Sequence, residues 1–464
     1  MEANFSYATD ELWEKDRDHL IHPFSDLSAN KAEGCTVIAE ADGVHVYDSD
    51  GNRFLDGIGG LWCVNIGYGR EEMAQAIADQ VRRIPFYSGF VNLTNPPATE
   101  LAAKLAELAP GNLERVMFGT GGSMANDSAV RIIHHYFNRL GKPEKKHVIS
   151  REHAYHGSTY LAIALTGPTY HEGWDVANGF IHHIPEPDSY RRPDGMSLDE
   201  FCDLRVQDLE DKILEIGPEK VACFIAEPIM GAGGMIVPPP GYQKRTFEVC
   251  RKHDVLYISD EVVTAFGRLG HMFATQDVFG FTPDVLTCAK GLTSGYQPLS
   301  ATILSEDIYD VISAPGAAFF HGFTYTGHPV ACAAGLKNIE ILEREDICGN
   351  VRRTGPMFEA ALQGLRDLEL VGDVRGSHFM MCIESVADRA TKELLPEAAN
   401  VGKRIADACQ KRGLIVRPLG HLNILSPPLI VTDGQIEEIG QILRGAIQET
   451  MDDLVREGLW QPKS

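Results

Sequence analysis

The feature that most constrains the fold of this chain is a repeated order in which a short apolar run leads directly into polar residues. The first two apolar runs are residues 115–118 and 147–150, and between them residues 124–140 carry apolar side chains at helical spacing. Continuously apolar strands that alternate with helices indicate a mostly parallel sheet covered on both faces. We therefore expect an α/β fold, with strands at residues 115–118, 147–150, 221–226, 255–259 and 284–288.

The two ends of the chain have a different pattern and predict a smaller α+β domain. Residues 43–47 and 53–56 flank a turn of the type that joins a β-hairpin. We expect residues 1–74 to join the small domain, residues 75–336 to form the large domain and residues 337–464 to complete the small one. There we predict helices at 337–345, 350–367, 395–412 and 434–456, and strands at 369–375, 378–384, 414–417 and 422–425.

Composition excludes several classes of function. The chain has 464 residues and a formal net charge of −23. Nucleic-acid phosphates require basic surfaces, and so does electrostatic docking on anionic membranes. Residues 1–20 contain acids and no apolar core of a signal peptide. Residues 311–336 lack charged side chains, but their prolines, histidines and glycines favour a buried connection or a subunit interface over a membrane span.

Cysteine and histidine spacing gives no metal or disulfide signal. The ten cysteines are scattered and form no C-x-x-C pair, and H-E-x-x-H does not occur. The histidine doublets at 134–135 and 182–183 do not have metal-ligand spacing. We expect a cytoplasmic protein with reduced thiols and no metal site.

The glycine-rich segment 119–126 lies between a predicted strand and a predicted helix. Glycines let the backbone approach an anion, and a helix N-terminus offers unpaired N–H groups with a partial positive charge. Met124 breaks the G-x-G-x-x-G/A pattern of dinucleotide sites, and no Lys-Ser/Thr pair of a P-loop follows. The segment is a candidate phosphate site; a purely structural turn is the alternative.

Polar residues at the ends of predicted strands are the candidate chemical groups. Ser123, Glu227, Asp260 and Lys290 each follow an apolar strand and would meet at one edge of the sheet. Asp260 would pair with a cation such as a protonated heterocyclic nitrogen, or cap a helix. A buried Lys290 would be nucleophilic towards carbonyls, whereas an exposed one would not.

Two further residues have both a binding and a structural interpretation. Tyr155, after the second strand, would stack on a planar cofactor or pack in the core. Arg417 follows an apolar run and precedes a proline; it would bind a substrate carboxylate or form an internal ion pair.

The order and spacing of these residues resemble the class III aminotransferases, which are fold-type I pyridoxal-phosphate enzymes. The resemblance implies a large domain with a seven-stranded, mostly parallel sheet. Many members have Gly-Ser-Glu-Ala-Asn where this chain has Met124 at the Glu position. The segments that carry the resemblance are 118–127, 154–157, 225–228, 259–262 with 266–268, 289–291, 323–329 and 374–376.

The resemblance also assigns roles in binding pyridoxal phosphate. Lys290 would hold the cofactor as an internal aldimine and move the substrate proton, and Asp260 would keep the pyridinium nitrogen protonated. Tyr155 and Val262 would pack on opposite faces of the ring. The remaining implied cofactor contacts are Gly122 and Ser123 at the phosphate, His156, Glu227 near the hydroxyl, and Thr324 from a partner subunit.

Similarity to the amine:pyruvate branch implies an aromatic substrate pocket and a dimer. The pocket would contain Phe24, Trp62, Tyr155 and Phe90, the last contributed by the partner. Arg417 would bind the carboxylate of the acceptor and swing out for uncharged amines. Thr324 and Phe90 thus imply a homodimer, with a tetramer as the other possibility.

The activity implied is an ω-transaminase that moves an amino group from an ω-amino acid or primary amine to pyruvate in a ping-pong cycle. A 2-oxoglutarate-dependent enzyme of the 4-aminobutyrate type, or another pyridoxal-phosphate chemistry of the family, is the alternative. A nucleotide-binding oxidoreductase or a catalytically silent interaction protein is a more distant one, which the mismatch at Met124 disfavours.

Overall fold

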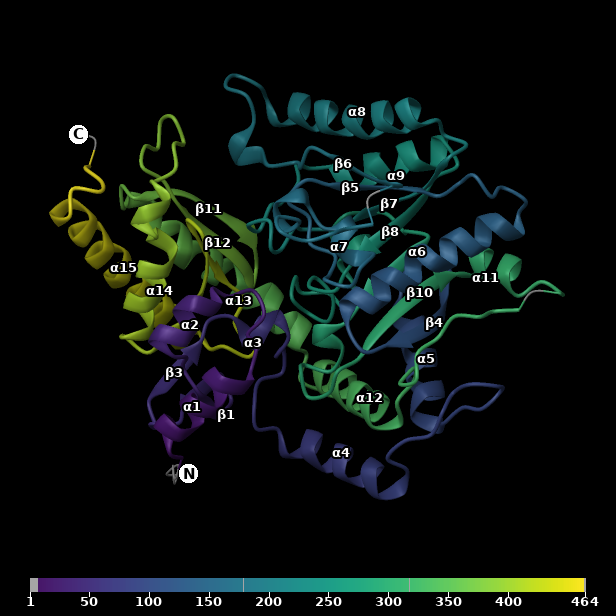
Figure 1. Cartoon of the computed structure of the whole chain (residues 1–464), viewed down its shortest axis with the longest axis horizontal. Coiled ribbons are helices and arrows are strands. Elements are labelled where there is room, and N and C mark those ends of the chain that lie inside the picture. The colour runs from purple at the N-terminus through teal and green to yellow at the C-terminus, as the bar shows by residue number, and fades with distance from the viewer. Residues whose placement is uncertain (1–6, 178, 317, 463–464) are drawn as a thin grey trace.

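The computed structural model describes residues 7–177, 179–316 and 318–462. A seven-stranded sheet of order β4-β10-β9-β8-β7-β5-β6 forms the centre of the larger part (Figure 1). Of its strands, β10 alone runs antiparallel to its neighbours, and the pairs from β9 to β6 are parallel. The strands are β4 (Leu113–Gly119), β5 (His147–Arg151), β6 (Ile181–Ile184), β7 (Val221–Ala226), β8 (Leu256–Asp260), β9 (Val285–Cys288) and β10 (Ser300–Ser305).

Helices cover both faces of this sheet, which confirms the predicted α/β class. One face packs against α6 (Gly122–Arg139), α7 (Ala162–Leu165) and α11 (Glu306–Ile312). The other packs against α8 (Leu198–Ile216) and α9 (Tyr242–Lys252), which lie on the opposite side in Figure 1. Both faces of the central strands are therefore shielded from solvent, which explains why β7 is apolar throughout.

Two strands of the sheet are absent from the sequence-based prediction. The edge strand β6 has the sequence Ile-His-His-Ile, and its two central side chains are only partly buried. Strand β10 is fully buried, but three of its six residues are Ser or Thr. Neither strand has the continuous apolar run that identified the others.

The smaller part contains two four-stranded sheets. One has the order β11-β12-β15-β14; the other, β1-β2-β3-β13, joins N-terminal strands to the chain near residue 414. The predicted hairpin is confirmed, because β2 and β3 pair antiparallel. These strands are β1 (Ile38–Asp42), β2 (His45–Asp48), β3 (Arg53–Asp56), β11 (Val371–Ser377), β12 (Met380–Ser385), β13 (Leu414–Ile415), β14 (Arg417–Leu419) and β15 (Leu422–Leu425).

Two helices near the C-terminal half begin at positions that differ from the prediction. Helix α12 (Pro329–Arg344) starts eight residues earlier than expected, because Pro329 occupies its first turn, where no N–H is needed. It runs across residue 336, so the domain limits at 74 and 336 stay a prediction. Helix α14 (Val401–Gln410) starts later than residue 395, after Asn400 in a left-handed conformation. Helices α13 (Ile347–Gln363) and α15 (Asp433–Arg456) complete this region.

The N-terminal segment packs loosely on the rest of the chain. Neither α1 (Thr9–His19) nor α2 (Leu27–Glu33) contains a buried residue. Across the described ranges, no helix has the length and apolar character needed to cross a bilayer. The remaining helices are α3 (Gly59–Trp62), α4 (Glu71–Arg83), α5 (Pro96–Leu108) and α10 (Ala274–Asp277).

Candidate active site

A cavity of about 430 Å³ lies beyond the carboxyl ends of the central strands. It brings together Ser123, Glu227, Asp260 and Lys290, which come from the ends of four different strands or the turns after them. Parallel strands present their carboxyl ends at one sheet edge, so residues far apart in the sequence share this space. Gly122, Tyr155, His156, Val262 and Trp62 also line it.

Asp260, the last residue of β8, is 4% exposed and is held by several donors. Its Oδ2 accepts a hydrogen bond of 2.8 Å from Asn126 Nδ2 and lies 2.7 Å from His156 Nδ1. Its Oδ1 accepts from the Val262 amide at 3.1 Å. These donors stabilise the carboxylate form and fix its orientation, so a cation in the cavity meets an ordered negative charge.

Asn126 is a functional candidate that sequence reasoning did not select. It lies on α6, three residues after Ser123, so both side chains project from the same face of the helix. Besides its bond to Asp260, it donates to the His156 carbonyl oxygen and accepts from Thr287 Oγ1. The three-residue spacing was the signal that could have identified it.

Lys290 follows β9 in a tight turn and points its amine into the cavity. Burial lowers the pKa of the Lys290 amine, and the negative charge of Asp260 acts in the opposite direction. Its Nζ lies 5.2 Å from the centre of the Trp62 ring and makes no hydrogen bond or ion pair with the described residues. Asn338 Nδ2 donates to the carbonyl oxygens of Gly291 and Leu292 and so holds the turn. Because a lowered pKa increases the fraction of unprotonated amine, Lys290 is a better nucleophile than an exposed lysine.

The first turn of α6 forms one wall of the cavity. The helix has 18 residues, and the backbone N–H groups of its first turn carry a partial positive charge. A Cβ at Gly122 would lie 2.9 Å from Val262 Cγ1, so glycine is needed for the close approach. Ser123 Oγ accepts a hydrogen bond of 3.1 Å from the Ser158 amide. This wall suits a phosphate group.

Glu227 is buried and connects the wall at Tyr155 to a neighbouring loop. Its carboxylate accepts from the Tyr155 amide at 3.0 Å and from the Gly231 amide at 2.8 Å. Burial raises the pKa of the Glu227 carboxyl, against the nearby positive charges. A protonated Glu227 can donate a hydrogen bond to an oxygen in the cavity.

Aromatic rings and one arginine form the mouth of the cavity. The Tyr155 ring meets Phe24 edge-on at 6.0 Å and Tyr170 at 5.6 Å, between ring centres. The Arg417 guanidinium lies 5.3 Å from the Trp62 ring centre. Burial lowers the pKa of Arg417, which makes no ion pair with any described carboxylate. Tyr170 was not among the sequence candidates.

Four of the sequence candidates are not among the described residues that line the cavity: Phe24 and Arg417, which lie beside lining rings, and Phe90 and Thr324. Thr324 is exposed and Phe90 is 47% exposed, and neither is among the described residues that line the cavity. Phe90 instead packs beside Gly322, close to Thr324 in the sequence. Their expected roles across a subunit interface therefore stay predictions.

The donor set fits a planar heterocycle that carries a phosphate and a carbonyl. The buried carboxylate suits a protonated ring nitrogen, the α6 N-terminus suits the phosphate, and the Lys290 amine, whose pKa is lowered by burial, suits the carbonyl. The His156 Nε2 atom is buried and has no partner among the described residues, as in a site whose polar groups await a ligand.

Comparison with known proteins finds similarity along almost the whole chain. A family model described as Aminotransferase class-III matches residues 27–447. The putrescine–pyruvate aminotransferase of Pseudomonas aeruginosa is 42% identical over 453 residues, covering 97% of this chain and 99% of that protein. The diaminobutyrate–2-oxoglutarate transaminase of Halomonas elongata is 38% identical over 464 residues, covering 97% and 98%. The structure of an (S)-enantioselective ω-transaminase from Thermomicrobium roseum is similar with a TM-score of 0.94 at 40% identity, covering 96% of this chain and 99% of that chain.

Proposed function

This chain belongs to the class III aminotransferases, and from that premise we propose that it transfers an amino group from a primary amine or ω-amino acid to pyruvate. Members of this family depend on pyridoxal phosphate. The observation that carries the proposal is the Lys290 amine, which has no hydrogen-bond or ion-pair partner among the described residues, in the same cavity as the hydrogen-bonded Asp260 carboxylate.

The residues of the cavity suit pyridoxal phosphate in a defined arrangement. Lys290 would bind its carbonyl carbon, Asp260 its ring nitrogen, and Gly122 with Ser123 its phosphate. Val262 and Tyr155 would confine the ring, and Glu227 and His156 would complete the polar surroundings. When bound, this cofactor supplies an electron sink for the carbanion formed at the donor carbon.

The chain's own groups would then perform three tasks. Lys290 Nζ, whose burial favours the uncharged form, would accept the proton from the carbon atom of the donor that carries the amino group. Asp260 keeps its negative charge in place through the Asn126 and His156 contacts. The aromatic rings at the mouth exclude water from the reacting atoms.

Arg417 supports an acceptor that carries a carboxylate. Its guanidinium is half-buried at the cavity mouth and has no acidic partner in the described chain, so it is free to bind a carboxylate in bidentate fashion. No arginine is among the described residues that line the cavity itself. One nearby guanidinium matches the single carboxylate of pyruvate better than the two of 2-oxoglutarate, which remains the alternative acceptor.

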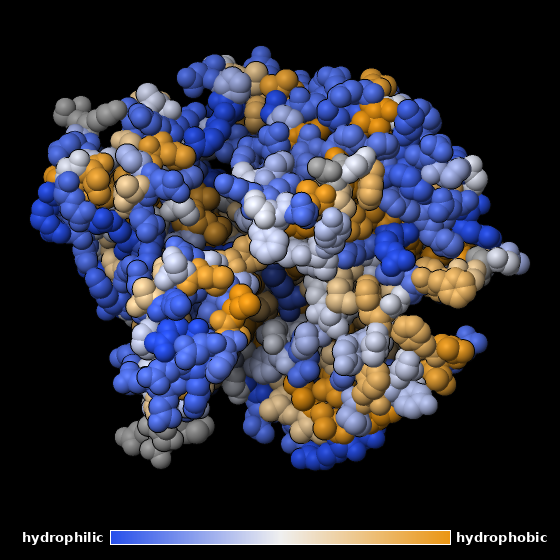
Figure 2. Space-filling view, in the orientation of Figure 1, coloured by the Kyte–Doolittle hydropathy of each residue, from blue (hydrophilic) through white to orange (hydrophobic). Residues whose placement is uncertain are grey.

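A homodimer is part of the proposal. Two segments outside the cavity expose aromatic and aliphatic side chains, and Figure 2 shows hydrophobic surface where they lie in Figure 1. Within residues 311–336, which were expected to be a buried connection or a subunit interface, the part from residue 329 on is largely buried in α12, whereas Phe320 is 91% exposed. The exposure of Phe320 supports the interface alternative for its part of the range. A second copy would cover this surface and bring Thr324 and Phe90 to the neighbouring cavity. The exposed side chains are Phe86, Tyr87, Phe90, Val91, Leu93, Phe319, Phe320 and Tyr325.

The test is product formation by the purified protein supplied with pyridoxal phosphate. With putrescine as donor, pyruvate should yield alanine, and 2-oxoglutarate should yield little glutamate. Lys290→Ala should abolish both products, whereas Lys252→Ala, at an exposed lysine paired with Glu210, should not. More glutamate than alanine would show that 2-oxoglutarate is the preferred acceptor. Full activity of Lys290→Ala would refute the role of Lys290.

A further inference from the structure

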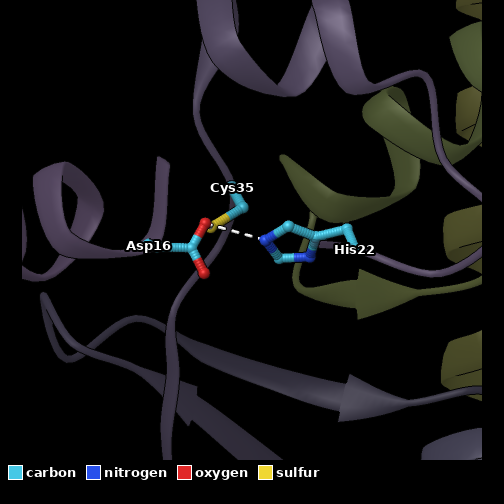
Figure 3. Close-up of side chains that lie close together, drawn as sticks. All are labelled: Asp16, His22 and Cys35. Carbon is cyan, nitrogen blue, oxygen red and sulfur yellow. Dashed lines mark hydrogen bonds and ion pairs between the residues drawn. The ribbon is translucent and has the colours of Figure 1, made fainter. Parts of the chain in front are cut away.

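Three side chains of metal-binding type meet in the N-terminal segment, away from the cavity. Asp16 comes from α1, His22 from the loop after it, and Cys35 from the connection after α2 (Figure 3). Asp16 Oδ2 lies 2.7 Å from His22 Nε2 and 3.4 Å from Cys35 Sγ. One ligand atom from each residue lies within 4.8 Å of the other two.

We propose that Asp16, His22 and Cys35 form a binding site for a divalent cation of the zinc type. Carboxylate oxygen, imidazole nitrogen and thiolate sulfur are all ligands of Zn²⁺, and the sulfur disfavours Mg²⁺ and Ca²⁺. The Asp16 carboxylate and the Cys35 thiolate together balance the double charge of the ion. Three protein ligands leave a fourth position for water.

The present geometry is close to what such an ion requires. Bonds of about 2.0–2.3 Å in a tetrahedron place neighbouring ligand atoms about 3.3–3.8 Å apart. The Asp16–Cys35 separation already falls in that range, and the Asp16–His22 pair has to open by less than about 1 Å. All three side chains are partly exposed, so the ion can enter from solvent without unfolding the segment.

Binding exchanges one proton for the ion. In the metal-free state the Cys35 thiol donates its hydrogen to Asp16 Oδ2. When the ion binds, the S–H bond breaks, a metal–sulfur bond forms, and the thiol proton passes to solvent. The hydrogen on His22 Nε2, which faces Asp16 in the metal-free state, is replaced by one on Nδ1 through exchange with water, so that the Nε2 lone pair binds the ion; no electron is transferred. Burial and the neighbouring Asp16 raise the pKa of the Cys35 thiol, and the positive charge of the ion acts against both effects.

The ion would link three pieces of a segment that has little other support. Helices α1 and α2 bury no residue, so apolar packing contributes little to holding this segment in place. Phe24 stands two residues after His22, adopts a left-handed backbone (φ 52°) and contacts the Tyr155 ring. A metal link would therefore hold Phe24 at the cavity mouth; this consequence rests on the proposed function, whereas the metal site itself does not.

The sequence did not indicate this site, since residues 16, 22 and 35 match no metal-binding motif. The expectation of no metal site came from the histidine doublets and the absence of known patterns. Only the chain fold, which returns Cys35 to the end of α1, places the three ligands together.

The test measures zinc bound by the holoenzyme after dialysis against micromolar Zn²⁺. The wild type should retain one zinc per chain more than Cys35→Ser and His22→Ala. Cys348→Ser, which removes another half-buried cysteine, should bind as the wild type does. With Co²⁺, the wild type should show a thiolate-to-metal absorption band that Cys35→Ser lacks. Equal metal content in the wild type and Cys35→Ser would overturn the proposal.

Hydrogen exchange of residues 9–36 provides an independent measurement. Zinc should slow exchange in the wild type and in Cys348→Ser, and should leave exchange in Cys35→Ser unchanged. No slowing in the wild type would refute the link between the ion and the segment. Both readouts are independent of transamination, so a failure of the proposed function would not imitate a failure of the metal site.

Discussion

Replacing Asn126 by alanine tests whether the orientation and charge of Asp260 depend on its buried partners. The Asn126 amide donates to Asp260 Oδ2 and to the His156 carbonyl oxygen, each at 2.8 Å. Its oxygen accepts from Thr287 Oγ1 at 2.7 Å. The variant removes one of the donors that stabilise the Asp260 carboxylate.

The expected magnitude follows from the charge of the acceptor. A hydrogen bond to a charged group contributes about 1.5–3 kcal/mol. Since a factor of ten corresponds to about 1.4 kcal/mol, loss of this hydrogen bond corresponds to a factor of about 10 to 150. Because the oriented Asp260 carboxylate pairs with the cofactor nitrogen in the proposed function, kcat/KM should fall by a factor in this range.

The assay is alanine formation from putrescine and pyruvate, with the melting temperature recorded for each variant. Thr287→Val is the matched control, because it removes the contact to the Asn126 oxygen and leaves the donor to Asp260 in place. Thr287→Val should retain kcat/KM within about threefold, a difference below about 1 kcal/mol. An Asn126→Ala enzyme as active as the wild type, or an equal loss in Thr287→Val, would refute the reasoning.

Three further results are expected. Arg417→Ala should raise the KM for pyruvate about 10- to 100-fold in steady-state kinetics, because a charge-assisted contact is lost, and should change the KM for putrescine much less. His134→Gln should reduce the loss of stability at low pH that urea unfolding measures. Burial lowers the pKa of His134 to about 4. As pH falls from 6.5 to 4, the unfolded chain takes up a proton there that the folded chain does not, which lowers the free energy of unfolding by up to about 3 kcal/mol. Gly157→Ala should weaken pyridoxal-phosphate binding about tenfold in a cofactor titration, because the new Cβ would lie 2.3 Å from Ser123 Oγ at a φ of +133°.

Each of these expectations has a control or an opposing result. An equal change in KM for pyruvate and putrescine would remove the proposed role of Arg417. An unfolding midpoint that falls equally with acid in His134→Gln and wild type would assign the loss to other groups. Gly173→Ala, at another positive φ but with no atom within 4 Å of the added Cβ, separates backbone strain from the clash at Ser123.

The fold could be predicted where local pattern and burial agree. Strand β7 is apolar at every position because both of its faces are covered, so its sequence alone identifies it. Strand β10 is equally buried, but half of its residues are Ser or Thr, so it has no continuous apolar run. Its one threonine makes a contact that the sequence does not display, because Thr302 Oγ1 donates to the Ala125 carbonyl oxygen. Strand β6 lies at the sheet edge, where partial exposure permits histidines.

The residues of the candidate site also fall into two groups, those that the sequence could identify and those whose contacts only the folded chain shows. Asp260 and Lys290 could be selected from the sequence because each follows a predicted strand, and parallel strands present their carboxyl ends together. The helical spacing after Ser123 places Asn126 on the face of the cavity, but its contact with Asp260, 134 residues away, exists only in the folded chain. Tyr170 had no such signal, and its contact with the Tyr155 ring also comes from the fold. The contacts expected for Phe90 and Thr324 across a subunit interface stay predictions, because the structure of a single chain does not test them.

Local sequence thus specifies the class of fold and the chemical groups at the strand ends, because periodic burial and strand direction are encoded within a few neighbouring residues. The lowered pKa of Lys290, the ordered Asp260 carboxylate and the meeting of Asp16 with Cys35 depend on packing. Desolvation and hydrogen bonding across distant segments set these properties, and such contacts exist only after the chain has folded.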